Sequence, residues 1–174
     1  VKDVKLYKGD IPAEFGGRLA SLLDIRQKEG NMKKISGAGG IGLISSRFTI
    51  EGPIIKDKMS FIAAGRRSYA DIFLRLSNNE ELKDNIIYFY DFNFKANYII
   101  DKKNRLFFSR YMGRDVVRIG SGSDAFKMSW GNSTITMRYN HLFSEKLFSN
   151  FTYVRSHYDY KLGSDEGTGA FKWL

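Results

Sequence analysis

The strongest constraint on the fold is a regular alternation of apolar and polar side chains between residues 88 and 100. Apolar residues stand at every even position of this stretch: Tyr88, Tyr90, Phe92, Phe94, Ala96, Tyr98 and Ile100. Polar residues stand at the odd positions between 91 and 97: Asp91, Asn93, Lys95 and Asn97. Successive side chains of a β-strand point to opposite faces of its sheet, so the stretch predicts a long strand with one apolar and one polar face.

Similar strands recur with a regular rhythm along the rest of the chain. Three short polar turns are centred near Asp57, Lys102 and Glu145, which lie 45 and 43 residues apart. Longer polar or Gly-rich connections lie at about 70–86, 118–125 and 161–170. The predicted strands occupy about 35–50, 59–69, 88–100, 105–117, 132–143 and 147–158. This rhythm predicts an all-β fold of antiparallel up-and-down hairpins, part of a transmembrane β-barrel with short turns at one rim and long loops at the other.

Two stretches depart from the regular pattern. In 105–117, Arg110 and Arg114 have the same parity as the apolar residues Leu106 and Phe108, so the pattern does not assign the two sides of this strand. Inside the first long connection, residues 71–76 predict a short helix, which is too short to change the fold class.

The apolar side of the 88–100 strand favours contact with lipid. A soluble sheet alternates too, because one face packs on a core while the other meets water. Here the apolar side is long and aromatic at both ends, and the sequence predicts no helix or second sheet to cover it. We therefore expect an aromatic girdle with Tyr88 and Tyr90 at one membrane interface, Tyr98 at the other, and Phe92 as a further member.

Composition narrows the classes of protein that remain. The 174 residues are 43% hydrophobic and 27% charged, which excludes wholesale disorder, and the apolar runs fall far short of the roughly 20 residues of a spanning helix. Cysteine is absent, so disulfides and thiolate metal sites are excluded. The net charge of +9 suits several anionic partners and selects none of them. A soluble β-sheet module that binds carbohydrate or polyanions is the alternative to a barrel.

The candidate catalytic and cofactor motifs lack the surroundings that their chemistry needs. Residues 37–42 match the three-glycine spacing of dinucleotide-binding loops, but the residues that follow them read as a strand instead of the required helix. His141 and His157 have no second ligand at a metal-binding spacing. We expect no enzymatic activity, no cofactor, no metal site and no nucleic-acid partner.

Residues 1–31 differ from the repetitive part of the chain. Residues 4–7 and 22–26 look like short strands, and between them Pro12 and the pair Gly16 and Gly17 supply a turn and a tight bend. Residues 29–31 read as a boundary. The first residue is Val1 and no signal peptide is evident, so we expect the chain to be a segment of a longer protein.

The order of these features resembles TonB-dependent outer-membrane receptors. Residues 7–30, with Phe15, Gly16 and Gly17 followed by Asp24 and Ile25, look like the end of the plug domain of that family. The stretches 39–47, 51–54 and 65–69 are similar to the opening barrel hairpin of receptors that carry an amino-terminal carboxypeptidase-regulatory-like domain. That subgroup is typical of nutrient uptake in Bacteroides-like bacteria. The resemblance covers about residues 1–160.

The resemblance implies two parts and a transport function. Residues 1–31 would be the C-terminal end of the plug domain, and residues 32–174 the first six or so strands of a truncated barrel of the plugged class. Such a protein imports a scarce nutrient (a siderophore, vitamin, peptide or glycan) through the outer membrane of a diderm bacterium. The partners that it implies are the TonB complex, outer-membrane lipid, a small nutrient ligand and, in some receptors, a surface lipoprotein.

The resemblance and the charge pattern also nominate site residues. Ligand contacts are expected from the plug apex and from the loops at 70–86, 115–125 and 159–172; the apex residues are Phe15, Gly16, Gly17 and Arg18. Arg66 and Arg67 are adjacent, so their side chains should point to opposite faces. One of them is expected to pair with a plug carboxylate such as Glu14 or Asp24. The alternative is that both lie at the rim.

Overall fold

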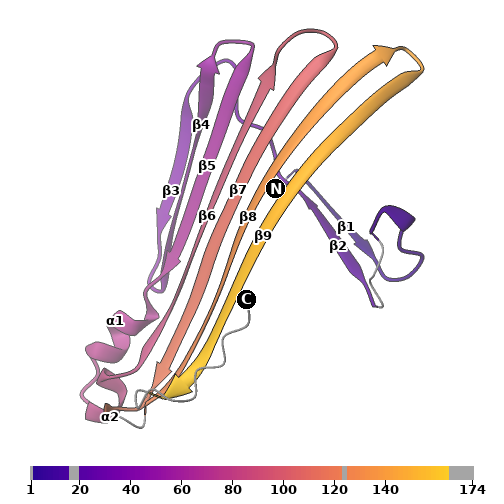
Figure 1. The fold of residues 1–174 in the computed structure, drawn as a ribbon. Helices are drawn as coiled ribbons and strands as arrows, with labels where there is room; N and C mark the ends of the chain where they lie inside the picture. Colours follow the sequence, from indigo (N-terminus) through magenta and orange to yellow (C-terminus); the bar gives the residue numbers. More distant parts are fainter. Residues whose placement is uncertain (1, 16–19, 123–124, 165–174) are drawn as a thin grey trace.

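The computed structural model describes residues 2–15, 20–122 and 125–164, which form two antiparallel β-sheets (Figure 1). The smaller sheet pairs β1 (Asp3–Tyr7) with β2 (Leu22–Arg26). The larger sheet has seven strands in chain order: β3 (Ser36–Ile41), β4 (Ser45–Ile55), β5 (Met59–Ser68), β6 (Ile86–Ile99), β7 (Asn104–Ile119), β8 (Phe126–Ser144) and β9 (Leu147–Ser164). The prediction of an all-β fold with up-and-down antiparallel strands is confirmed. The larger sheet is open, and within the described residues β3 and β9 are its edges.

The three predicted turns and the first two predicted long connections lie where the sequence placed them. Of the third connection, predicted at 161–170, residues 161–164 belong to β9 and the remainder lies outside the described residues. Short turns near Asp57, Lys102 and Glu145 join β4 to β5, β6 to β7 and β8 to β9. The first long connection contains α1 (Ala70–Arg75) and α2 (Glu80–Lys83), and a short 3-10 helix, η1 (Ala13–Phe15), lies between β1 and β2. No helix among the described residues is long and apolar enough to span a membrane.

The strand predicted at 35–50 is two strands, so the large sheet has seven strands where six were expected. The chain turns after Ile41, and the backbone N–H of Gly42 donates to the carbonyl of Ser45 at 2.9 Å. Tyr69 holds this turn, because its backbone N–H donates to Ile44 O and its hydroxyl to Gly42 O. The alternation of apolar and polar residues does not predict this turn, because Leu43 and Ile44 are apolar. The Gly-rich residues 37–41 are indeed a strand, with a second strand after the turn, so the geometry of a dinucleotide-binding loop is absent.

The strand register assigns a face to every residue of the large sheet, because directly opposed residues point to the same side. We call the side that carries Phe92, Phe94 and Ala96 the apolar face, and the side that carries Asn93 and Lys95 the polar face. The apolar face continues across neighbouring strands, with Phe61 and Phe108 opposite Ala96. The rings of Phe61 and Phe108 lie 6.5 and 6.1 Å from the ring of Phe94.

The register also settles the facing of β7, which the sequence pattern left open. Arg110 lies opposite Phe94 and Arg114 opposite Tyr90, so both arginines are on the apolar face. Leu106 and Phe108 share that face nearer the short turns. The apolar face of β7 therefore changes from apolar to basic along its length.

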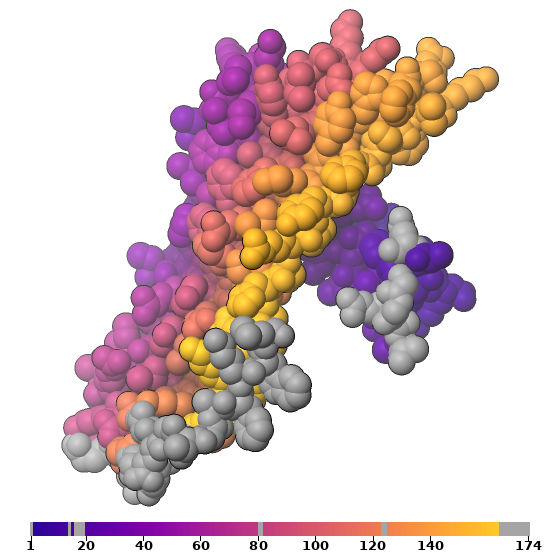
Figure 2. All heavy atoms as spheres, viewed as in Figure 1, coloured from indigo at the N-terminus to yellow at the C-terminus, as the bar shows by residue number. Residues whose placement is uncertain are grey.

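The large sheet has almost no hydrophobic core. Among the described residues only Ala96 and Ala125 are buried apolar residues. Large apolar side chains are exposed instead, including Phe151 at 72%. Figure 2 shows the large sheet as a thin curved wall, with the N-terminal segment standing off to one side. The apolar face is therefore left uncovered by the described part of the chain.

The turn between β6 and β7 is ordered by Asp101, and its order should depend on pH. Asp101 Oδ1 accepts the backbone N–H groups of Lys103 at 2.7 Å and of Asn104 at 2.9 Å, and the Asn104 side chain donates to the same carboxylate. These hydrogen bonds, the Asn104 side chain foremost, lower the pKa of Asp101 below its ordinary value of 3.8.

Because the folded pKa is lowered, the turn keeps this stabilisation at and above pH 3.8 and loses it as the pH falls through the lowered pKa. We expect the amide NMR shifts of Lys103 and Asn104 to titrate together below pH 3.8, and Asp101→Ala to abolish the titration. A midpoint at the ordinary aspartate value would contradict this assignment.

Candidate functional site

The N-terminal segment is attached to the sheet through residues 27–31, which run along the polar face. Gln27 Nε2 donates to Asn93 Oδ1 at 2.8 Å, and Lys95 Nζ donates to the Gln27 carbonyl at 3.2 Å. Lys28 Nζ forms an ion pair with Glu51 at 2.8 Å. We call this set of contacts the seam. It joins the two parts that the sequence separated at residue 31.

The buried centre of the seam is a contact between Gly30, Ser60 and Asn97. Ser60 is fully buried and Asn97 is 3% exposed. Ser60 Oγ lies 2.9 Å from the Gly30 carbonyl and 2.5 Å from Asn97 Oδ1, and its single proton serves one of these acceptors at a time. A Cβ on Gly30 would lie 2.0 Å from the carbonyl oxygen of Phe61. Only glycine allows this close approach of two backbones.

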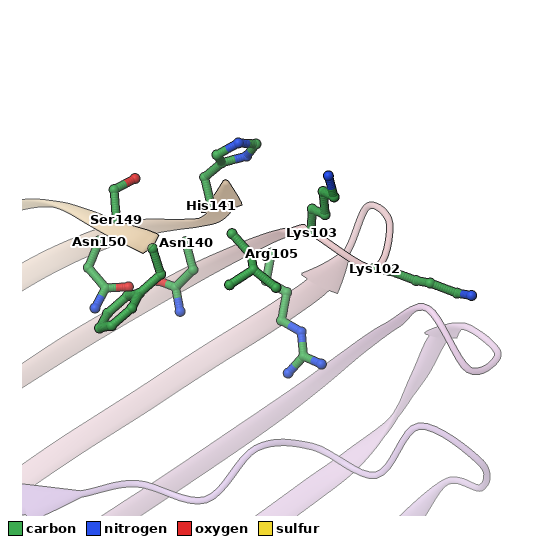
Figure 3. Close-up of a pocket in the computed structure, with 9 residues that line it drawn as sticks. Lys102, Lys103, Arg105, Asn140, His141, Ser149 and Asn150 are labelled. Carbon is green, nitrogen blue, oxygen red and sulfur yellow. The ribbon is translucent and has the colours of Figure 1, made fainter. Parts of the chain in front are cut away.

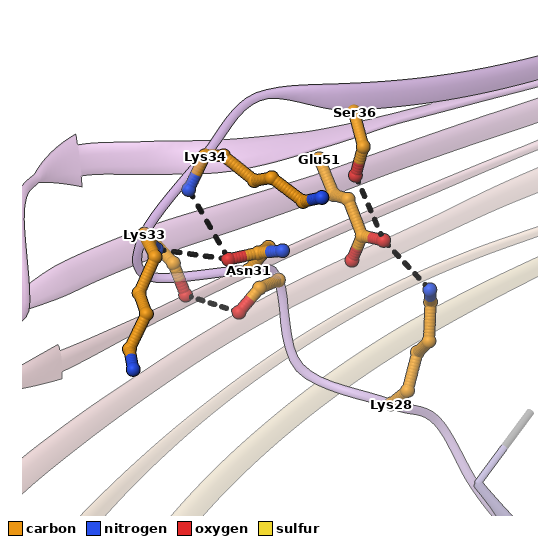
Figure 4. A network of polar contacts seen from close by, with 8 residues as sticks. Lys28, Asn31, Lys33, Lys34, Ser36 and Glu51 are labelled. Atoms are coloured by element: carbon orange, nitrogen blue, oxygen red, sulfur yellow. Dashed lines mark hydrogen bonds and ion pairs between the residues drawn. The ribbon is translucent and has the colours of Figure 1, made fainter.

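Beyond Gly30, the chain turns away from the polar face to enter β3 (Figure 4). Asn31 Oδ1 accepts the backbone N–H groups of Lys33 at 2.8 Å and of Lys34 at 3.2 Å, which fixes the turn. Ser36, the first residue of β3, donates its hydroxyl to the same Glu51 oxygen that Lys28 contacts. The boundary predicted at residues 29–31 therefore coincides with an ordered bend.

Arg66 and Arg67 point to opposite faces, as predicted. Arg66 is on the polar face, 2.9 Å from Asp91, and its guanidinium lies 4.7 Å from the ring centroid of Phe89. Arg67 is on the apolar face, with its guanidinium 5.5 Å from the ring centroid of Tyr88.

The structure does not bring either arginine to Asp24, whose carboxylate pairs with Arg26 at 3.3 Å. The other nominated carboxylate, on the side chain of Glu14, lies outside the described residues.

The residues nominated for ligand contacts are only partly described. Phe15 belongs to η1, and its ring centroid lies 6.4 Å from that of Tyr7. Gly16, Gly17 and Arg18 lie outside the described residues. In Figure 1 this hairpin stands apart from the large sheet, on the concave side of the curved strands.

The four residues nominated for the aromatic girdle share one face of β6. Tyr88, Tyr90, Phe92 and Tyr98 all lie on the apolar face, with Tyr98 nearest the short turns and Tyr88 nearest the long connection. Their side of the sheet is as predicted. Their level in a membrane stays a prediction.

The sequence pattern does not predict a group of basic residues that lies on the apolar face of β7 and β9. We call Arg110, Arg114, Arg155, His157 and Lys161 the basic patch. Arg114 reaches across β8 to Asp159 on β9, where the two side chains are 2.6 Å apart. Gly131 lies between them on β8, and a Cβ there would be 2.8 Å from the Asp159 carboxylate. The parity of Arg110 and Arg114 with their apolar neighbours was the only signal of this patch.

A pocket of about 340 Å³ lies at the short-turn end of β7, β8 and β9 (Figure 3). The cations Lys102, Lys103 and Arg105 line it, and the buried Asn140 Oδ1 has no hydrogen-bond partner among the described residues. Figure 3 shows Arg105 and Asn140 pointing to one side of the sheet. The lining could hold an anion, but it offers no nucleophile paired with a base.

The described residues include no group of three or more His, Cys, Asp or Glu side chains that could hold a metal ion. No protein-family model matches the chain, and searches of curated proteins and of solved structures found no match. The seam, the two faces of the sheet and the basic patch therefore carry the functional proposal.

Proposed function

We propose that the chain is part of a TonB-dependent outer-membrane transporter, which imports a scarce nutrient through a plugged β-barrel of a diderm bacterium. The observation that carries the proposal is the uncovered apolar face of a seven-stranded sheet with almost no core. Large contiguous apolar surfaces are rare on soluble monomers and mark contact with lipid or protein. An outward-facing band of apolar and aromatic residues is what a barrel wall presents to lipid.

The outline of the apolar surface supports tilted strands. On β5 the first charged residue of the apolar face is Arg67, opposite Tyr90. On β7 and β9 the first charged residues of the apolar face are Arg110 and Arg155. Both lie in the cross-strand row of Phe94 on β6. Phe94 is four residues closer to the short turns than Tyr90. The boundary thus crosses the strands obliquely between β5 and β7 and follows one row between β7 and β9. The oblique part has the course of a bilayer boundary on a barrel whose strands are tilted by about 35–45°.

The seam supports the proposed division of the chain. Residues 27–31 contact the polar face, which in a barrel is the face of the lumen. Residues 1–31 would then be the end of a plug held inside the wall, and residues 32–174 the wall itself. The open edges at β3 and β9 would pair with further strands, because an unpaired edge has no partner for its backbone groups in lipid.

The partners follow from these placements as parts of the same proposal. Lipid would cover the apolar face, and a small nutrient would bind the plug apex near Phe15 and the long connections. The TonB complex would act through a part of the plug that precedes residue 1, and a surface lipoprotein would meet the long-connection rim. Siderophore, vitamin, peptide and glycan importers share these features, and fold does not select among them.

The competing function is a soluble module that binds polyanions or carbohydrate. The pocket beside Lys102, Lys103 and Arg105 is the observation that favours it. The two functions differ in where the protein resides, and this difference can be measured.

An antibody raised against the denatured chain, used to probe fractionated membranes of the source cell, tests the proposal. We expect one band far larger than 20.0 kDa that co-fractionates with an outer-membrane marker and not with an inner-membrane marker. A soluble band near 20.0 kDa would overturn the transporter proposal and favour the soluble module.

A further inference from the structure

We propose that the basic patch binds the phosphate groups of lipid headgroups in the leaflet on the long-connection side of the sheet. This inference rests on the proposed membrane function and adds a lipid-binding site to it. The patch adjoins the apolar surface directly, since Arg110 follows Phe108 and Arg155 follows Tyr153 on the same face. Basic side chains at the edge of an apolar surface meet the headgroup layer.

The positive charge is confined to one end of the apolar surface on β7, β8 and β9. At the short-turn end, the polar residues of these strands on the same face are Asn104, His141 and Ser149, which include no lysine or arginine. At the other end lies the basic patch. This asymmetry points to one leaflet, the one nearer the long connections.

Arg110 and Arg155 are placed to share one phosphate. They lie in a single cross-strand row with Ile135 between them, two strand spacings or about 10 Å apart. Both are exposed, and neither forms an ion pair within the described residues. Two guanidinium groups that converge on one phosphate form the strong, directional hydrogen bonds that this group accepts.

The one acidic side chain near Arg110 and Arg155 already forms an ion pair with another arginine. Asp159 is the sole carboxylate on the apolar face of β7, β8 and β9 in the described residues, and it pairs with Arg114. It therefore leaves Arg110 and Arg155 uncompensated. Between the long side chains of β7 and β9, the facing residues of β8 are small: Ser129, Gly131 and Ser133.

Flotation of the full 174-residue chain with lipid vesicles tests the inference. One set of vesicles is pure phosphatidylcholine, and the other contains one part in five of the anionic lipid phosphatidic acid. The test variant is Arg110→Gln with Arg155→Gln. The matched control is Arg47→Gln with Arg138→Gln, which removes the same charge from exposed residues of the polar face.

We expect the parent chain to bind both sets of vesicles and to prefer the anionic set. The test variant should lose about thirtyfold of that preference, and the control should keep it. Binding to phosphatidylcholine should be equal in all three proteins. Inorganic phosphate at equal phosphate concentration should not displace the chain from anionic vesicles.

Other results would overturn the inference in distinguishable ways. Equal loss in the test variant and the control would mean a general charge effect without a site. Displacement by inorganic phosphate would mean a site for free anions instead of lipid. Failure of the parent chain to bind phosphatidylcholine would overturn the proposed membrane function, and the lipid site with it.

Discussion

Replacing Met137 by arginine should destabilise the chain folded in a phosphatidylcholine bilayer by about 1–2 kcal/mol, because Met137 lies one row inside the proposed headgroup boundary at Arg110 and Arg155, between an interface and the bilayer midplane of a barrel. Met137 lies on the apolar face of β8, between Phe108 and Tyr153, and is 48% exposed. The neighbouring Thr136 lies on the polar face, between Ser109 and Val154. Thr136→Arg adds the same charge one residue away and is the matched control, expected to cost less than about 1 kcal/mol.

Guanidinium-induced unfolding from vesicles measures both free energies of unfolding. The two variants distinguish an apolar face in lipid from one in water. In water, arginine at a half-exposed position would change the free energy of unfolding by almost nothing. If Met137→Arg and Thr136→Arg both stayed within about 0.5 kcal/mol of the parent, the apolar face would not contact lipid, and the transporter proposal would fail.

Replacing Gly30 by alanine should open the seam. The added Cβ would lie 2.0 Å from the Phe61 carbonyl oxygen, and backbone cannot yield as a flexible side chain does. Overpacking of this kind costs about 1–3 kcal/mol, and here it would also remove the contact of Gly30 with buried Ser60. Trypsin cleavage after Lys28 should therefore accelerate by about 5- to 150-fold, since cleavage follows the population of the open segment.

Gly9→Ala is the control for this measurement, because a Cβ on Gly9 would meet no atom within 4 Å. Mass spectrometry of the fragments separates cleavage after Lys28 from cleavage elsewhere. An unchanged rate in Gly30→Ala would show that the N-terminal segment is held to the sheet by something other than the seam.

The local pattern of apolar and polar residues predicts the strands of this protein well. It fails where residues distant in the sequence determine a turn or the facing of a strand. The alternation in 88–100 was sufficient to predict β6 and its two faces. The turn at 42–45 was missed because Leu43 and Ile44 carry no turn signal, and the hydroxyl and backbone of Tyr69, far along the chain, hold it. The facing of β7 needed the register with β6, because Arg110 and Arg114 interrupt its apolar side.

The same is true of the candidate site residues. Features set by strand geometry could be predicted, whereas features set by neighbours in space could not. Opposite facing of Arg66 and Arg67 follows from strand geometry alone and is confirmed. The partner of Arg66 could not be read from the sequence, because Asp91 becomes its neighbour only through the pairing of β5 with β6. Residue 30 was recognised as part of a boundary, but its need for glycine arises from Phe61, a residue of β5.

The length of β8 has a consequence for recognition at the cell surface. Its 19 residues extend about 60 Å, whereas a tilted strand needs about 9–11 residues to cross a bilayer. On the proposed function, roughly 15 Å of hydrogen-bonded sheet would stand clear of the hydrocarbon on the long-connection side. An antibody against intact cells would then recognise ordered strands as well as loops, and its epitope would vanish when the protein is unfolded.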